Sequence, residues 1–178
     1  MKEIGLKDRF KGEKLSSPKT LTGVAMLVAL YTILSFFTLN ISATAKIGFA
    51  YLALGVCGMM FGPIAGGIAG AAGDVLGYFV NPNGPFFPGF TISAFIMGFL
   101  FGIVLYKKPI TIKRTMIAVL VVMVVCNTVL TPIWLNLMYG SSLIALPRII
   151  RNILLYPVNV ALMHIVLKGV HSFRKSIA

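Results

Sequence analysis

Negative charge is scarce in this sequence, and its scarcity narrows the classes of protein that the chain can encode. Only four of the 178 residues are Asp or Glu, and charged residues of both signs make up 11% of the chain, whereas 58% are apolar. A soluble domain carries about 25% charged residues, so this composition favours a membrane protein. The net charge of +12 does not indicate nucleic-acid binding, because Lys and Arg lie between long apolar blocks rather than along one face.

Motifs for catalysis and nucleotide binding are also missing. The sequence contains neither the G-x-x-x-x-G-K-[ST] pattern of a P-loop nor H-E-x-x-H. His164 and His171 have no neighbouring ligand-type residues, and no Ser or Cys stands beside a plausible base, so we expect no enzyme activity, no metal site and no cofactor. Cys57 and Cys126 each lie inside an apolar segment without metal-ligand spacing, and we expect both to pack as small apolar side chains.

Apolar segments of the length needed to cross a membrane recur along the chain, since about 20 helical residues span a hydrocarbon core of ~30 Å. The six candidates are residues 21–39, 47–60, 63–80, 92–106, 116–138 and 149–170. The second and fourth are short, and we expect them to be tilted or shielded by neighbouring helices. The sequence therefore predicts an all-α membrane protein, a bundle of six transmembrane helices.

The basic residues predict the orientation of this bundle. The mixed-charge tail at residues 1–19 is not a signal peptide, because a signal would place a cleavable apolar core after a short basic patch. With this tail in the cytoplasm, thirteen of the 16 Lys and Arg residues fall on the cytoplasmic side, in agreement with the positive-inside rule. We therefore predict that both termini are cytoplasmic, with the membrane domain at 20–172 and a short C-terminal tail at 173–178.

The remaining charges gather on the predicted outer side. Lys46 begins the second helix, Arg148 and Arg151 begin the sixth, and Asp74 lies past the middle of the third. A charged group in or near hydrocarbon is costly and indicates a functional site by default. An internal ion pair between Asp74 and an arginine is the alternative. Three cations against one anion leave a surplus of positive charge, which suits an anionic solute.

Small residues repeat at four-residue spacing in two helices. Gly62, Gly66 and Gly70 form such a row in the third helix, and Asp74 continues it. Small residues let helix backbones approach closely in lipid, so we expect this row to fix the position of Asp74. In the first helix, Ala25 and Ala29 form a similar pair, which either packs inside the bundle or offers a smooth surface to a partner membrane protein.

Polar and aromatic residues on the outer halves of the later helices complete a candidate site. Asn127, Thr131 and Trp134 follow at i, i+4 and i+7, a spacing that places them on one helical face, and Pro132 is expected to kink that helix. Trp134 is either an interfacial belt residue or a stacking surface for a flat ring. The loop NPNGPFFPGF, at residues 81–90, predicts a stiff aromatic rim over an outward-facing cavity.

These motifs resemble the substrate-binding S components of energy-coupling factor (ECF) transporters, most closely the folate-specific ones. The resemblance covers roughly residues 20–170 and is carried by AMLVA, KIGFAYLALGVCGMMFGPIAGGIAGAAGDVLGYF and NPNGPFFPGFTISAFIMG. LTPIWLNLMYGSSLIALPRIIRN and LLYPVN are most similar to the folate-specific members.

The resemblance implies a six-helix bundle that binds a vitamin from outside and works with a scaffold transmembrane subunit and two ATPase subunits in a bacterial plasma membrane. It implies that Ala25 and Ala29 contact the scaffold. Folate has a flat pterin and a glutamate tail, so Asp74 can accept hydrogen bonds from the pterin, aromatic side chains can stack on its rings, and the outer cations can face the tail. The predicted substrate-binding residues are Lys46, Tyr51, Asp74, Asn81, Phe86, Phe87, Asn127, Trp134, Asn136, Arg148, Arg151 and Asn152.

Two alternatives stay open at this point. An S component for another vitamin, such as pantothenate or a thiamine precursor, would share most of these motifs. A secondary transporter coupled to protons through Asp74 would usually show internal repeats, and the sequence has none that we detect.

Overall fold

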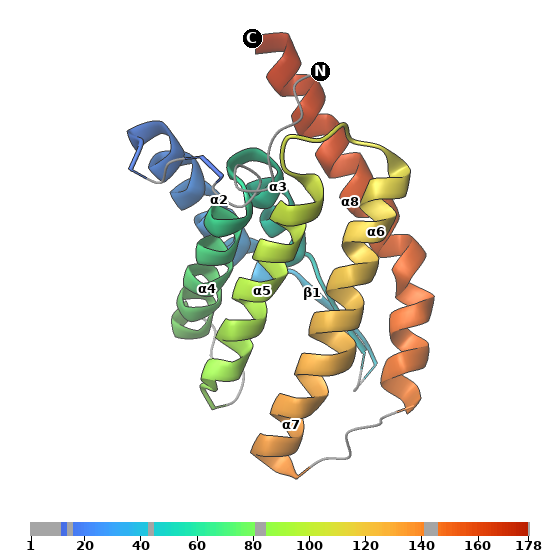
Figure 1. Ribbon diagram of the computed structural model, residues 1–178. Coiled ribbons are helices and arrows are strands. Elements are labelled where there is room, and N and C mark those ends of the chain that lie inside the picture. The colour runs from blue at the N-terminus through green and yellow to red at the C-terminus, as the bar shows by residue number, and fades with distance from the viewer. Residues whose placement is uncertain (1–11, 14–15, 43–44, 81–84, 141–145, 178) are drawn as a thin grey trace.

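The computed structural model describes residues 12–13, 16–42, 45–80, 85–140 and 146–177, and Figure 1 shows their arrangement. For residues 38–42, 45–47, 139, 146–149, 151 and 174–177 the description is confined to the backbone. The elements, in chain order, are α2 (Pro18–Phe36), β1 (Thr38–Ser42), β2 (Ala45–Gly48), α3 (Ala50–Phe61), α4 (Pro63–Val80), α5 (Pro88–Leu105), α6 (Ile112–Val122), the π-helix η1 (Met123–Leu130), α7 (Thr131–Tyr139) and α8 (Leu146–Ile177).

The helices form one bundle, which confirms the predicted helical membrane fold. Because α6, η1 and α7 continue one another as a single span, the described residues contain six helical crossings, of which five are long and apolar enough to traverse a membrane. The remaining one, α3, is short, and residues 52–58 in it are buried without interruption. Its neighbours therefore shield it, as expected. The fourth span is longer than predicted, because α5 already begins at Pro88.

The first two helices are joined by a β-hairpin, which the sequence interpretation missed. It assigned residues up to 39 to the first helix and residues from 47 to the second, whereas Thr38 pairs with Gly48 in an antiparallel ladder of β1 and β2. The hairpin extends from the middle of the bundle toward the end where α7 finishes (Figure 1). The hairpin therefore brings backbone from the loop after α2 to the same end as the predicted site.

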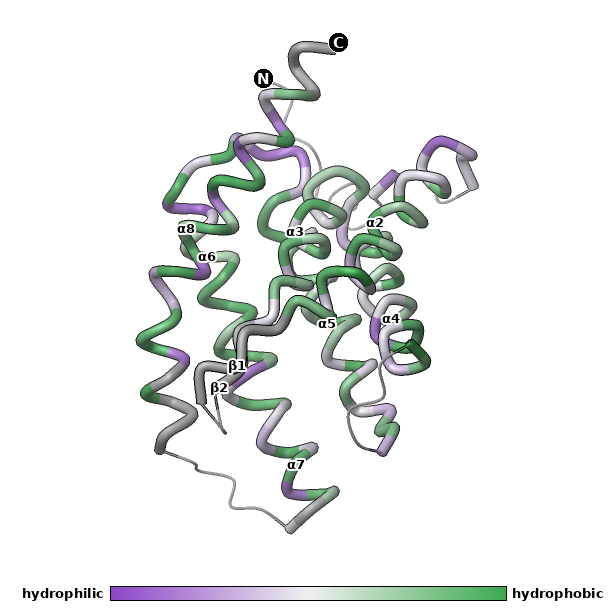
Figure 2. Tube along the Cα trace, turned by 180° about the vertical axis from the view of Figure 1, so that it is seen from behind, coloured by the Kyte–Doolittle hydropathy of each residue, from purple (hydrophilic) through white to green (hydrophobic). Residues whose placement is uncertain are grey.

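Hydrophilic residues gather at one end of the bundle (Figure 2). α2 begins and α8 finishes at one end, where α5 also connects to α6 (Figure 1). Figure 2 shows hydrophilic residues gathered there, whereas the spans between the ends are largely apolar. Large apolar side chains such as Met26, Phe79, Leu154 and Ile165 are exposed on the outside of the helices. This outer surface suits contact with lipid, because lipid tails are as apolar as these side chains.

Glycines set the spacing between α4 and its neighbours. A Cβ atom placed on Gly66 would lie 2.5 Å from the backbone oxygen of Gly98 in α5, and one placed on Gly70 would collide with the backbone oxygen of Ala94. The absence of side chains at these positions lets the two helices meet backbone to backbone, as expected for a small-residue row in lipid. Asp74 continues this row and is therefore held against α5.

Candidate functional site

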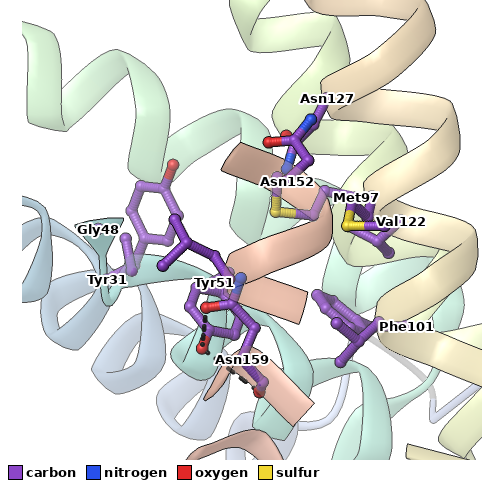
Figure 3. A pocket seen from close by; sticks show the side chains of 13 residues that line it. Tyr31, Gly48, Tyr51, Met97, Phe101, Val122, Asn127, Asn152 and Asn159 are labelled. Carbon is purple, nitrogen blue, oxygen red and sulfur yellow. Dashed lines mark hydrogen bonds between the residues drawn. The ribbon is translucent and has the colours of Figure 1, made fainter. Parts of the chain in front are cut away.

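The first cavity lies inside the bundle and is shown in Figure 3. It has a volume of about 300 Å³, and the residues that line it come from α2, the hairpin, α3, α5, α6, η1 and α8. Its apolar wall includes Met97, Phe101 and Val122, and its polar groups are two tyrosine and three asparagine side chains. A largely apolar cavity with a few convergent polar groups is the usual form of a small-molecule site.

The asparagines of this cavity are placed to exchange hydrogen bonds with a ligand. The Tyr51 hydroxyl donates to Oδ1 of Asn159 at 3.1 Å, which connects α3 to α8. Asn152 is only 7% exposed, and within the described part of the chain its Nδ2 has no hydrogen-bond partner. Asn127 of η1 lines the same cavity (Figure 3). Because an unpaired buried donor is costly, the amide of Asn152 suits a ligand that supplies an acceptor.

A second cavity, of about 340 Å³, lies between α2, α4, the start of α5 and α7. Its lining is aromatic around one carboxylate: Tyr78, Phe86, Phe87 and Phe90 accompany Asp74. Tyr31 of α2 lines this cavity and the first one alike. The two cavities therefore share one tyrosine in their walls, and the volume of each falls in the range of about 300–1,000 Å³ that is typical of ligand sites.

Asp74 is held in the second cavity by α5. Thr91 Oγ1 donates a hydrogen bond of 2.7 Å to Oδ2 of Asp74. No described Lys or Arg side chain forms an ion pair with the carboxylate, and the side chains of Arg148 and Arg151, the candidate partners in an internal ion pair, lie outside the described residues. One carboxylate oxygen is thus oriented by the protein, and Asp74 lines the cavity wall with acceptor capacity to spare.

Trp134 contributes to the rim of the second cavity through its neighbours. Its indole Nε1 donates to Oγ of Ser93 at 2.9 Å, and its ring lies 5.7 Å from the ring of Phe87. Phe87 in turn lines the cavity, as does Leu135, the residue after Trp134. The indole is anchored inside the protein rather than serving only as an interfacial belt residue.

The structure brings most of the described candidates to these two cavities. Tyr51, Asn127 and Asn152 line the first, and Asp74, Phe86 and Phe87 line the second. Asn136 is half-buried on α7, where its backbone oxygen accepts the N–H of Gly140 at 2.8 Å.

The predicted cations can be placed only by their backbones. Lys46 lies in β2, two residues before the cavity residue Gly48, and Arg148 and Arg151 lie in the first turns of α8, just before Asn152. Their side chains, and all of Asn81, lie outside the described residues.

The sequence interpretation missed Tyr31, Asn159, Thr91 and Ser93. A signal for Asn159 was present, because it follows Asn152 by seven residues and therefore shares a face of α8. Tyr31 gave no such signal, since it stands in an apolar run of the first span. The proposed partner residues Ala25 and Ala29 are exposed on the outside of α2, so they do not pack inside the bundle.

Comparison with known proteins gives one consistent family. A family model described as ECF-type riboflavin transporter, S component, matches residues 15–171. A folate transporter FolT of Clostridium novyi (strain NT) is 32% identical over 143 residues, which cover 79% of this chain and 83% of that protein. A folate transporter FolT of Leuconostoc mesenteroides is 30% identical over 154 residues, covering 82% and 83%.

Solved structures agree with this result. A crystal structure of FolT bound with folic acid has a TM-score of 0.79 and 35% identity, and the match covers 86% of this chain and 95% of that one. A structure of the S component of a bacterial ECF transporter has a TM-score of 0.63 at 23% identity, covering 88% and 98%, and shows the shared fold. With its helical membrane fold and its paired cavities, the chain belongs to the S components of ECF transporters, a family of transporter subunits rather than enzymes.

Proposed function

We propose that this chain is the folate-binding S component of an ECF-type vitamin importer. The observation that carries the proposal is the likeness to the FolT chain bound with folic acid, which extends over 86% of this chain at 35% identity. The matching family model is described for riboflavin, so that vitamin is the competing ligand, ahead of pantothenate or a thiamine precursor. Folate and riboflavin both have flat heterocyclic rings, but only folate has a glutamate tail with two carboxylates.

The second cavity suits the pterin ring. The donor edge of the pterin consists of the 2-amino group and the N3 hydrogen. It matches the carboxylate of Asp74, which can accept a hydrogen bond from each of these groups. The rings of Tyr78, Phe86 and Phe90 surround this position and offer apolar contact to a flat heterocycle. Thr91 keeps the carboxylate from turning away from the cavity.

The first cavity suits the glutamate end of the ligand. Asn152 has a buried donor without a partner in the described residues, and a carboxylate oxygen is a strong acceptor for it. Lys46, Arg148 and Arg151 adjoin this cavity along the chain, and we propose that they neutralise the two carboxylates of the tail. Asn81 and Asn136 complete the proposed set of substrate-binding residues.

The remaining parts of the proposal concern the assembly. We propose that a scaffold transmembrane subunit contacts α2 at the exposed Ala25 and Ala29, and that two partner ATPase subunits hydrolyse ATP. The end at which α8 finishes is proposed as the cytoplasmic one, because Lys107, Lys108 and other basic residues lie there. The chain would then be a multi-pass protein of the bacterial plasma membrane with both termini inside.

A binding experiment tests the proposal directly. The chain contains one tryptophan, Trp134, in ring contact with a wall of the second cavity, so bound folate should quench its fluorescence. Purified protein should be quenched and thermally stabilised by folate at low concentration, and riboflavin should not compete. Mass spectrometry of what co-purifies provides an independent check. Saturable binding of riboflavin with no response to folate would overturn the proposal.

A further inference from the structure

The π-helix η1 interrupts the fifth span, and Thr131 caps the C-terminal end of η1. The backbone N–H of Thr131 bonds to the backbone oxygen of Cys126, five residues earlier. Thr131 Oγ1 donates to the same oxygen at 2.8 Å. In an α-helix a threonine hydroxyl reaches the carbonyl three or four residues back, so a bond to the fifth is particular to the wider turn.

Pro132 gives a reason for the wide turn. In an α-helix its ring would collide with the carbonyl of Thr128 and would leave that carbonyl without its usual donor. Widening the preceding turn moves the carbonyl groups away from the ring. Thr128 Oγ1 follows the same spacing, since it donates to the backbone oxygen of Met123 at 3.2 Å. π-helical turns are rare and occur frequently at functional sites.

The register of this turn sets the neighbours of the site residues. Cys126 Sγ contacts the backbone oxygen of Ser93 at 3.7 Å, and Ser93 Oγ accepts the indole N–H of Trp134. Asn127 lines the first cavity, whereas Leu135 lines the second. Each residue of an α-helix turns the chain by about 100°, so one residue more or less per turn would rotate α7 by that angle relative to α6. Asn127 and Trp134 would then no longer face their present partners together.

We propose that Thr131 is a positioning residue, whose hydroxyl holds the π-helical register and thereby sets Asn127 in the first cavity and Trp134 beside the second. The oxygen atom of its side chain is directed to Cys126 rather than to either cavity. The effect on ligand binding therefore passes through Asn127 and Trp134. That part of the inference rests on the proposed folate site, whereas the effect on Trp134 itself does not.

The test replaces Thr131 by valine, which keeps the shape and removes the hydroxyl. The matched control is Thr22→Val, because Thr22 Oγ1 donates to the backbone oxygen of Pro18 at 2.9 Å in an ordinary α-helical turn of α2. Two quantities are measured on the purified full chain: the emission of Trp134 without ligand, and the Kd for folate. Thr131→Val should shift the emission and raise Kd about fivefold, the effect expected for one lost hydrogen bond. Thr22→Val should change neither.

Thr131→Ser provides the rescue, since serine retains the hydroxyl, and it should behave as the wild type does. Unchanged emission and unchanged affinity in Thr131→Val would overturn the inference, and so would a serine variant that behaves like valine. If Thr131→Val does not yield folded protein, Thr131→Ala takes its place with the same expectations. If the wild type binds no folate, the proposed function fails, while the emission of Trp134 still decides the role of Thr131.

Discussion

Replacing Gly66 by alanine should force α4 away from its neighbours and destabilise the whole bundle. The new Cβ would lie 2.5 Å from the backbone oxygen of Gly98 and 3.2 Å from Cα of Gly58. The first of these distances is 0.9 Å short of the 3.4 Å at which ordinary contact begins. Both obstructing atoms belong to backbone, so no side chain can rotate to make room.

The expected cost follows from this geometry. Overpacking a close-packed interior typically costs about 1–3 kcal/mol, and backbone on two sides places Gly66→Ala at the upper end, about 3 kcal/mol. For a chain of this size, each kcal/mol lowers Tm by roughly 2–4 °C, so we expect a loss of about 6–12 °C. Affinity for folate should fall as well, because displacing α4 from α5 lengthens the bond between Thr91 and Asp74.

The two cysteines provide the assay. Cys57 is 0% exposed and Cys126 is 1% exposed, so a thiol-reactive fluorophore labels them only as the protein unfolds. Gly169→Ala in α8 is the matched control, because a Cβ there meets nothing within 4 Å. This control should keep the wild-type Tm or exceed it slightly, as alanine favours helix. The reasoning would be refuted by a Gly66→Ala protein that melts together with the control.

Three further substitutions test the site and the partner surface. Asp74→Asn should raise the Kd for folate by about 10- to 100-fold, because an amide cannot accept hydrogen bonds from both pterin donors. The Kd for pteroate, which lacks the glutamate, should rise equally. Titration with both ligands checks this, and an unchanged Kd would exclude Asp74 as the pterin anchor. Asn152→Leu should raise the Kd for folate about tenfold but leave the Kd for pteroate unchanged. Tm should stay constant or rise, because an unpaired buried donor is removed. Equal losses of affinity for both ligands would contradict the assignment of the glutamate tail to the first cavity. Replacing Ala25 and Ala29 together by tryptophan should abolish folate uptake in cells while binding to the purified chain persists; lost binding would point to a role of these residues inside the bundle.

The boundaries of the third span show what the sequence can predict. Residues 63–80 were predicted and α4 covers the same range, because Gly62, with φ of 99°, ends α3 and Pro63 starts the next helix. Local chemistry determines such boundaries. Asp74 was recognisable for a related reason, since a lone carboxylate in an apolar helix requires a partner or a ligand.

For the hairpin and the π-helix the local signals were present but incomplete, since Pro132 predicts a kink without its register. Residues 38–48 alternate polar and apolar side chains, a period of two that is typical of a strand and that the span prediction overlooked. The pairing of Thr38 with Gly48 depends on how the two strands meet. The π-helical register likewise depends on packing against Ser93 as well as on Pro132. The predicted common face of Asn127, Thr131 and Trp134 stays a prediction, and the three side chains have different neighbours.

Tyr31 lines both cavities, so on the proposed folate site one elongated ligand would occupy two compartments that share this side chain. Such a ligand behaves as two tethered fragments, and its affinity exceeds that of either piece because the second contact becomes intramolecular. A pterin and a glutamate derivative offered separately would then occupy the protein side by side, each weakly. The protein would then distinguish vitamins that share a flat ring through the first cavity, which binds the tail and not the ring.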